Sequence, residues 1–146
     1  MTASRLSLAL EQGAVHLPAT GDITLFRPPA GMDLSALPTA RLRLVHGAAP
    51  DHAYWSALGY RVSTSAPDSA AGAIVCVPRA KAQARDLVAR ALAHGGPVIV
   101  DGQKTDGVES LLRDLRGRVE VSAPFSKAHG KCFSVSGPPA ALANWV

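Results

Sequence analysis

Residues 73–101 read AIVCVPRAKAQARDLVARALAHGGPVIVD, and this stretch decides the fold. Two short apolar runs, 73–77 and 97–100, have the length of buried strands. Residues 81–94 between them carry apolar side chains at helical spacing, and Gly95 and Gly96 end that helix. Strands that are apolar throughout and alternate with helices are typical of a parallel sheet covered on both faces.

The pattern continues toward the end of the chain. Residues 108–116 place four apolar side chains on one face of a helix, and Asp106 is expected to cap it. Residues 119–122 and 130–135 are expected to be strands on either side of a basic turn. We expect this closing pair to add antiparallel strands at the edge of the sheet.

The first seventy residues are less regular. We expect helices at 5–12 and 52–58, the second with Asp51 as its N-cap and Gly59 as its C-cap residue. Short runs that are apolar, or that alternate apolar with polar residues, are expected to form strands at 14–17, 22–26, 41–46 and 60–64. Residues 41–46 alternate arginine with leucine, which predicts a strand with one apolar face. The sequence thus predicts one α/β domain over 1–136, with 137–146 beginning a linker.

Composition narrows the class of protein. The chain has 146 residues, 47% of them hydrophobic, and no apolar run of membrane-spanning length. A cytoplasmic location is the default expectation. Cys76 and Cys132 lie singly in apolar runs and are expected to be buried free thiols. No metal-ligand spacing is present among the histidines. The net charge of +4 arises from residues 71–146, an excess that permits an anionic partner without requiring one.

The segment from Asp101 to Gly107 follows a buried strand, where open α/β sheets place their ligand sites. Gly102 and Gly107 would let a ligand approach the backbone, and Lys104 could reach a phosphate. The spacing matches neither of the two glycine-rich nucleotide-binding motifs. The alternative is a plain turn in which the glycines adopt special backbone angles and Asp106 caps the next helix.

Basic side chains gather in two further places. Lys127, His129 and Lys131 share one turn, which suits contact with phosphate groups. A solvated edge hairpin that uses lysine against strand pairing explains the same residues. Arg79 and Lys81 follow an inner strand and could face the side of Lys104, and the alternative is ordinary surface charge at a helix start.

The order of these features resembles a known family. Pro78 and Lys81 follow a strand, an apolar strand runs into Asp101 and Gly102, and residues 104–108 open a helix. A strand containing residues 131–133 then follows Gly130. About 55 residues of this kind resemble the N-terminal domain of the RsmC family, the 16S rRNA guanine-N2 methyltransferases.

This resemblance implies a Rossmann-like, methyltransferase-type fold and a parent enzyme with two such domains in tandem. In that family the second domain binds S-adenosylmethionine and holds guanine with an Asn-Pro-Pro-[Phe/Tyr] motif, and the first assists folding and RNA engagement. Residues 137–139 read Gly-Pro-Pro and lack that asparagine, and no cofactor glycine loop is present. The resemblance therefore implies a non-catalytic domain whose partners are small-subunit rRNA and its own C-terminal domain. It implies no cofactor in this chain, and S-adenosylmethionine on the missing catalytic domain.

Two other hypotheses remain open from the sequence. One is a free-standing small-ligand or nucleotide-binding module, with Asp101, Lys104 and Asp106 lining a pocket at the strand ends. The other is a purely structural half that packs against its partner domain and exposes an apolar patch for it.

Overall fold

A single mixed sheet organises the computed structural model, which describes residues 4–145. Its strands lie in the order β3-β2-β1-β4-β5-β8-β6, and β7 pairs with β8. The first five strands are mutually parallel, and β8 runs antiparallel to β5, β6 and β7. The strands are β1 Ile23–Phe26, β2 Leu42–Val45, β3 Val62–Ser63, β4 Gly72–Cys76, β5 Val98–Gln103, β6 Glu120–Val121, β7 Phe125–Lys127 and β8 Gly130–Ser136.

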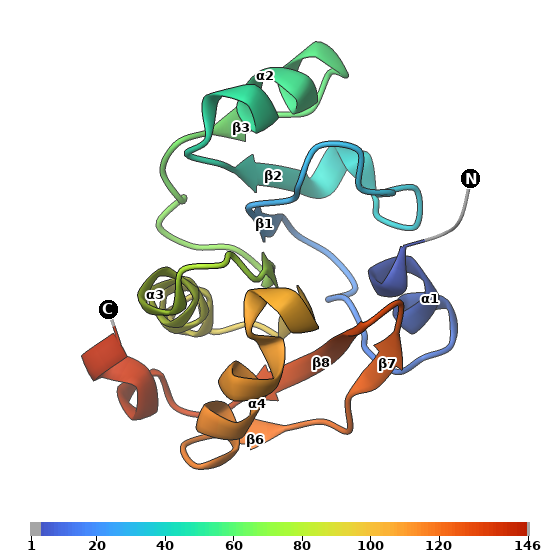
Figure 1. The fold of residues 1–146 in the computed structure, drawn as a ribbon. Helices are drawn as coiled ribbons and strands as arrows, with labels where there is room; N and C mark the ends of the chain where they lie inside the picture. Colours follow the sequence, from blue (N-terminus) through green and yellow to red (C-terminus); the bar gives the residue numbers. More distant parts are fainter. Residues whose placement is uncertain (1–3, 146) are drawn as a thin grey trace.

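Helices cover both faces of this sheet (Figure 1). The apolar residues of α1 and α2 share one core cluster with one face of the strands, and those of α3 and α4 share a second cluster with the other face. We call these the α1 face and the α3 face. The α-helices are α1 Arg5–Glu11, α2 Ala49–Ala57, α3 Lys81–Ala93 and α4 Val108–Arg116, and the 3-10 helices are η1 Thr39–Arg41, η2 Lys104–Asp106 and η3 Pro139–Trp145.

The two cores follow from the alternation of side chains along each strand. On β4, Ile74 and Cys76 pack on the α1 face, whereas Ala73 and Val75 pack on the α3 face, and all four are buried. The predicted α/β class is therefore confirmed, as are the parallel inner strands and the antiparallel addition beside β5. Both cysteine thiols are free and buried, as expected.

Several expectations for the first half were wrong. Residues 14–17 form no strand, because the N–H groups of Ala14 and Val15 bond back to the carbonyl of Ala9 and continue the turn that ends α1. The strand expected over 60–64 is reduced to two residues. Helix α2 begins at Ala49 with no side-chain cap, so Asp51 lies inside its first turn. Gly59 lies one residue beyond the C-cap, with φ +92°.

The second half also required corrections. Asp106 does not cap α4, whose N-cap is Gly107 with φ +86° and no side-chain hydrogen bond. The strand expected over 119–122 is only two residues long. Strand β7 was not predicted, and it joins β8 through a turn in which Ala128 and His129 have positive φ.

The segment expected to begin a linker packs on the domain as far as Trp145. Leu142 is fully buried, and Trp145 is 9% exposed in the core of the α3 face. The guanidinium groups of Arg85 and Arg118 each lie 5.2 Å from the centre of the Trp145 ring. Residues 139–145 are thus part of the packed domain, and an onward catalytic domain stays a prediction. No helix in the part of the chain that the structure describes is long and apolar enough to cross a membrane.

Candidate functional site at the carboxyl edge of the sheet

The main candidate site is a hollow of about 460 Å³ at the carboxyl ends of the parallel strands. It lies where the chain order reverses, because β1 leads outward through β2 to β3 while its neighbour β4 leads the other way to β5. Open α/β sheets bind their ligands at this kind of switch point. The polar lining residues come from the start of α1, from the end of β5 and from the segments after β1, β2, β4 and β5, and they include Arg5, Arg27, His46, Asp51, Arg79, Asp101, Gln103 and Asp106.

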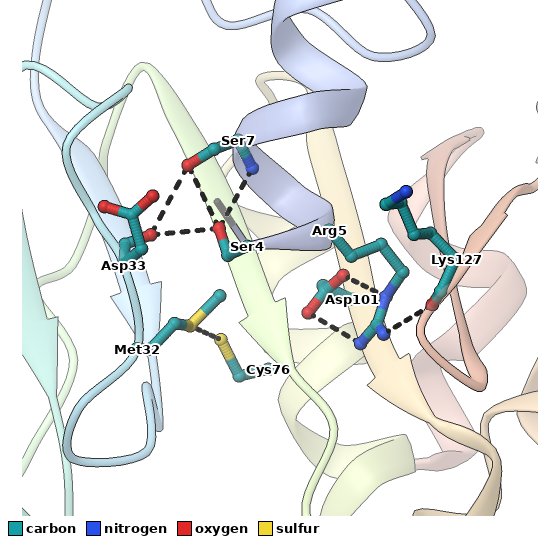
Figure 2. Close-up of polar contacts among 8 residues, drawn as sticks. All are labelled: Ser4, Arg5, Ser7, Met32, Asp33, Cys76, Asp101 and Lys127. Carbon is teal, nitrogen blue, oxygen red and sulfur yellow. Dashed lines mark hydrogen bonds and ion pairs between the residues drawn. The ribbon is translucent and has the colours of Figure 1, made fainter. Parts of the chain in front are cut away.

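A buried ion pair between Arg5 and Asp101 lines this hollow, and Figure 2 shows its contacts. Nε of Arg5 donates to Oδ1 of Asp101 at 2.8 Å, and Nη2 donates to Oδ2 at 3.2 Å. The third nitrogen of the guanidinium is also hydrogen-bonded, since Nη1 donates to the carbonyl of Lys127 at 3.0 Å. The two side chains are only 5% and 8% exposed. Arg5 therefore ties α1 to β5 and to the β7–β8 hairpin.

This pairing restricts what Asp101 can do. Burial raises the pKa of Asp101, and the Arg5 guanidinium opposes that rise by stabilising the carboxylate. Both carboxylate oxygens already accept hydrogen bonds from Arg5. Asp101, which the sequence suggested as a ligand contact, is thus primarily a structural partner. Arg5 was not singled out, because it lies 96 residues away in sequence and no local pattern marks it.

The loop after β1 contains no glycine turn that leads into an α-helix. Arg27 has φ +56°, and Pro28 and Pro29 follow it without a backbone N–H between them. Within the described residues, the connection from β1 to β2 contains only the 3-10 helix η1. A glycine turn leading into a helix N-terminus is the usual phosphate cradle of such sheets. That cradle is absent from residues 27–41, all of which the structure describes.

A buried histidine occupies the corresponding position after β2. His46 is 3% exposed, its Nδ1 accepts from the N–H of Ala48 at 3.2 Å, and its Nε2 lies 3.4 Å from Oδ2 of Asp51. Burial lowers the pKa of His46, Arg27 lowers it further, and Asp51 opposes them. A neutral ring with its proton on Nε2 satisfies both contacts. This role had no signal in the sequence, where the histidines were examined only for metal-ligand spacing.

The two thiols near the site are poor nucleophiles. Cys76 and Cys132 are the register partners of Asp101 on either side of β5. Burial raises the pKa of both thiols, and the nearby Asp101 carboxylate raises it further. The Cys76 Sγ lies 3.8 Å from the Met32 Sδ, in an apolar setting. Since the thiolate is the reactive form, these residues serve as packing groups.

The expected glycine loop after β5 has a structural explanation. A Cβ on Gly102 would come within 2.7 Å of Val77 and 3.1 Å of Val108, so glycine allows β5 to pack closely there. Gly107 supplies the left-handed residue before α4. Asp106 faces Arg79, with Oδ1 3.6 Å from Nε of an arginine whose side chain is 87% exposed.

The basic residues of the hairpin do not form one cluster. Lys127 pairs with Gly130, whereas Lys131 pairs with Ser126, so the two lysines point to opposite faces of the hairpin. Lys131 Nζ donates to Ser126 Oγ at 3.0 Å. Lys104 does lie beside the turn, because its N–H bonds to the carbonyl of His129 at 2.8 Å. The structure therefore brings Lys104 and His129 together.

The remaining predicted contact, Lys81, lines a small hollow with Arg79 and Asp106. Its Nζ lies 3.6 Å from Oδ2 of Asp114, the same oxygen that accepts from Arg85 at 2.6 Å. Lys81 thus joins α3 to α4. No group of three potential metal ligands occurs within residues 4–145.

Comparisons with known proteins identify the architecture. No protein-family model and no curated sequence matches this chain. Among solved structures, it is similar to the T. thermophilus 16S rRNA N2 G1207 methyltransferase RsmC in complex with AdoMet and guanosine, with a TM-score of 0.66 and 14% identity. That match covers 82% of this chain and only 36% of the enzyme. Thermoplasma acidophilum protein 1320 matches with a TM-score of 0.59 and 11% identity over 90% of this chain and 82% of that one. The chain therefore has a methyltransferase-like α/β fold.

Proposed function

We propose that this chain is a non-catalytic domain of an S-adenosylmethionine-dependent rRNA guanine-N2 methyltransferase, which helps to engage RNA and stabilises the catalytic domain. The likeness to the T. thermophilus enzyme supports the parent activity, and the chain spans about a third of that enzyme, 36% of its length. The cofactor and the chemistry then belong to a second domain.

The loop after β1 carries this proposal. Two adjacent prolines stand in the loop after β1, where the related catalytic domains carry a glycine-rich cofactor loop, and the crossover that follows contains no α-helix among the described residues. Asp101, at the end of β5, is held by Arg5. At the carboxyl edge of this sheet, the pair of Arg5 and Asp101 therefore anchors α1 and the β7–β8 hairpin.

RNA contact at this edge is proposed for Lys104, Lys127 and His129, with Lys131 and Arg79 on its margins. All of them except Lys131 are exposed, and Lys131 is half-buried. Contacts of this kind neutralise phosphates, so affinity depends on salt and little on sequence.

The test is RNA binding by fluorescence anisotropy across a salt series. The Lys127→Ala/Lys131→Ala variant is expected to bind an rRNA fragment several-fold more weakly, with a salt slope smaller by about 1 for each phosphate that the variant no longer neutralises. Arg90→Ala/Arg116→Ala removes the same charge from α3 and α4 and is the matched control. RNA affinity that ignores salt and the two lysines would contradict this surface.

The 460 Å³ hollow favours a second candidate function, a small-ligand or nucleotide-binding module. Its volume is within the range of small-molecule sites. Ligand binding to the native state raises the midpoint of thermal unfolding. An upward shift with adenosine nucleotides that Arg79→Ala removes would favour this function, and unchanged midpoints would count against it.

A further inference from the structure

A second group of cations lies at the opposite edge of the sheet. Arg41 precedes β2, Arg43 is on β2, and Arg61 precedes β3. Arg41 ends the 3-10 helix η1 and donates to the carbonyl of Gly21, while Arg43 on β2 donates to the neighbouring Asp22, so the two guanidinium groups lie beside adjacent residues. The pairing of Leu44 with Val62 places Arg61 next to Arg43. We call these three residues the arginine cluster.

The cluster is fixed in position around one carboxylate. Arg43 Nε donates to Asp22 Oδ2 at 2.6 Å, and Arg61 Nη2 lies 4.0 Å from Asp22 Oδ1. The hydrogen bond from Arg43 lowers the pKa of Asp22, and the charges of all three arginines lower it further. One aspartate therefore faces three guanidinium groups, and the cluster keeps a positive charge.

Backbone carbonyls hold the other two guanidinium groups. Arg41 donates to the carbonyls of Gly21 at 2.6 Å and Pro18 at 2.7 Å, and Arg61 donates to Ala40 at 2.8 Å. Each arginine has five N–H donors, so further donors remain for a ligand. A cation held in place loses little conformational entropy on binding.

Two of the three arginines are exposed, and Arg41 is half-buried. The side chains of Arg43 and Arg61 are 46% and 50% exposed. They line a shallow hollow of about 300 Å³ together with Ser63 and Ser65. The hollow is open because residues 64–71, which connect β3 to β4, form no helix over this part of the sheet.

The spacing of the cluster suits an extended anion. Arg43 and Arg61 lie next to each other on neighbouring extended segments, which are about 4.8 Å apart in a sheet, and Arg41 adds a third guanidinium group just before β2. The three guanidinium groups are therefore far enough apart to contact more than one anionic group of the same ligand. Planar guanidinium forks match phosphate oxygens through two N–H donors.

The surroundings favour a nucleic acid over an acidic protein surface. Protein interfaces are centred on large apolar or aromatic side chains. The large apolar side chains exposed within residues 4–145 are Tyr54 and Leu58, and both belong to the α2 region. Trp55 of α2 packs in the core of the α1 face, whereas Arg43 alternates with Leu42 and Leu44 of that core and so points to the other face.

We infer that Arg41, Arg43 and Arg61 form a second RNA contact, which binds the phosphate backbone at the edge of the sheet opposite the carboxyl-edge site. This inference rests on the proposed RNA-binding function and adds a surface to it. An RNA bound at both edges would cross the domain rather than touch it at one point.

The test compares RNA binding by two variants of the whole chain. Arg43→Gln/Arg61→Gln keeps polar side chains and leaves Arg41, which supports the backbone, in place. We expect its affinity for an rRNA fragment to fall about tenfold and its salt slope to fall by about 1.5, the value for two phosphates of a single-stranded RNA. Arg43→Lys/Arg61→Lys keeps the charge and is expected to recover part of the affinity. Circular dichroism checks that both variants are folded.

Three outcomes separate a failure of the inference about the arginine cluster from a failure of the proposed RNA-binding function. If the wild-type chain binds RNA and the glutamine variant binds it equally well, the inference is wrong and the proposed function stands. If the wild-type chain binds no RNA, both are wrong. If polyglutamate competes as strongly as polyuridylate of equal charge, the cluster recognises acidic protein, and its assignment to RNA is overturned.

Discussion

Two arginine–aspartate pairs stand at opposite edges of one sheet, and they differ chiefly in exposure. The Arg5–Asp101 pair has an N–O distance of 2.8 Å and side chains that are 5% and 8% exposed. The Arg43–Asp22 pair has a distance of 2.6 Å and side chains that are 46% and 39% exposed. Similar contacts therefore serve different ends, because a buried pair must be fully satisfied by the protein while an exposed one can still meet a ligand.

The largest expected effect comes from breaking the buried pair. Arg5→Met leaves the Asp101 carboxylate buried without its partner, and we expect the free energy of unfolding to fall by about 3–5 kcal/mol. Urea unfolding at pH 7 measures this. Asp101→Asn in the same background removes the charge and should restore part of the stability. An Arg5→Met variant as stable as the wild-type chain would contradict the assigned role of the pair.

The same variant should also respond to pH. Burial raises the pKa of Asp101, and without Arg5 nothing opposes that rise. In the unfolded state Asp101 loses its proton near the ordinary pKa of 3.8, whereas in the folded variant it keeps the proton to a higher pH. The free energy of unfolding therefore falls as pH rises from 3.8 to the raised pKa of the folded state. We expect the destabilisation by Arg5→Met to be smaller at pH 5 than at pH 8. An equal destabilisation at both values would mean that Asp101 is not the group responsible.

A smaller effect is expected where the backbone passes the buried pair. A Cβ on Gly130 would meet the Arg5 guanidinium and the carbonyl of Gly102. Gly130→Ala should lower the free energy of unfolding by about 1–3 kcal/mol. Gly117→Ala is the matched control, since Gly117 has φ −78° and its nearest neighbour is the Asp114 carbonyl at 3.6 Å. Equal urea midpoints for the two variants would show that the space at Gly130 is not restricted.

The smallest effect is expected at the exposed pair. Arg43→Gln should leave the urea midpoint almost unchanged, because surface pairs contribute little. The pKa of Asp22, lowered in the wild-type chain, should rise toward 3.8 when its first partner is removed. A lowered pKa stabilises the fold above the unfolded value, and this stabilisation disappears at acid pH, so any small difference should vanish there. NMR titration of the Asp22 carboxyl measures the shift, and an unchanged pKa would argue against the contact.

The sequence predicted the inner part of the fold better than its margins. Strands β4 and β5 and helix α3 were predictable because their apolar residues are contiguous or recur at helical spacing. Strand β7 was missed because it is three residues long, lies largely exposed, and enters a turn through Ala128 and His129 instead of glycine. Residues without turn chemistry give no local signal for positive φ.

The candidate site was predictable only in part. Its position after β4 and β5 follows from the topology of parallel sheets. The role of Asp101 could not be predicted from the topology, because its partner Arg5 comes from the other end of the chain. The opposite faces of Lys127 and Lys131 depend on a register that short strands do not reveal. By contrast, the alternation of Arg41 and Arg43 with leucines was already visible in the sequence.

Binding of S-adenosylmethionine to this chain, measured by titration calorimetry, is the most direct test of the proposed non-catalytic role. We predict no binding heat up to millimolar cofactor. Pro28 and Pro29 have no N–H groups to donate in the loop after β1, and the Asp101 carboxylate already accepts from Arg5. Saturable binding that Arg79→Ala or Arg27→Ala weakens would contradict this role. The carboxyl edge would then be a working cofactor site, and the chain could not be a non-catalytic domain of the proposed kind.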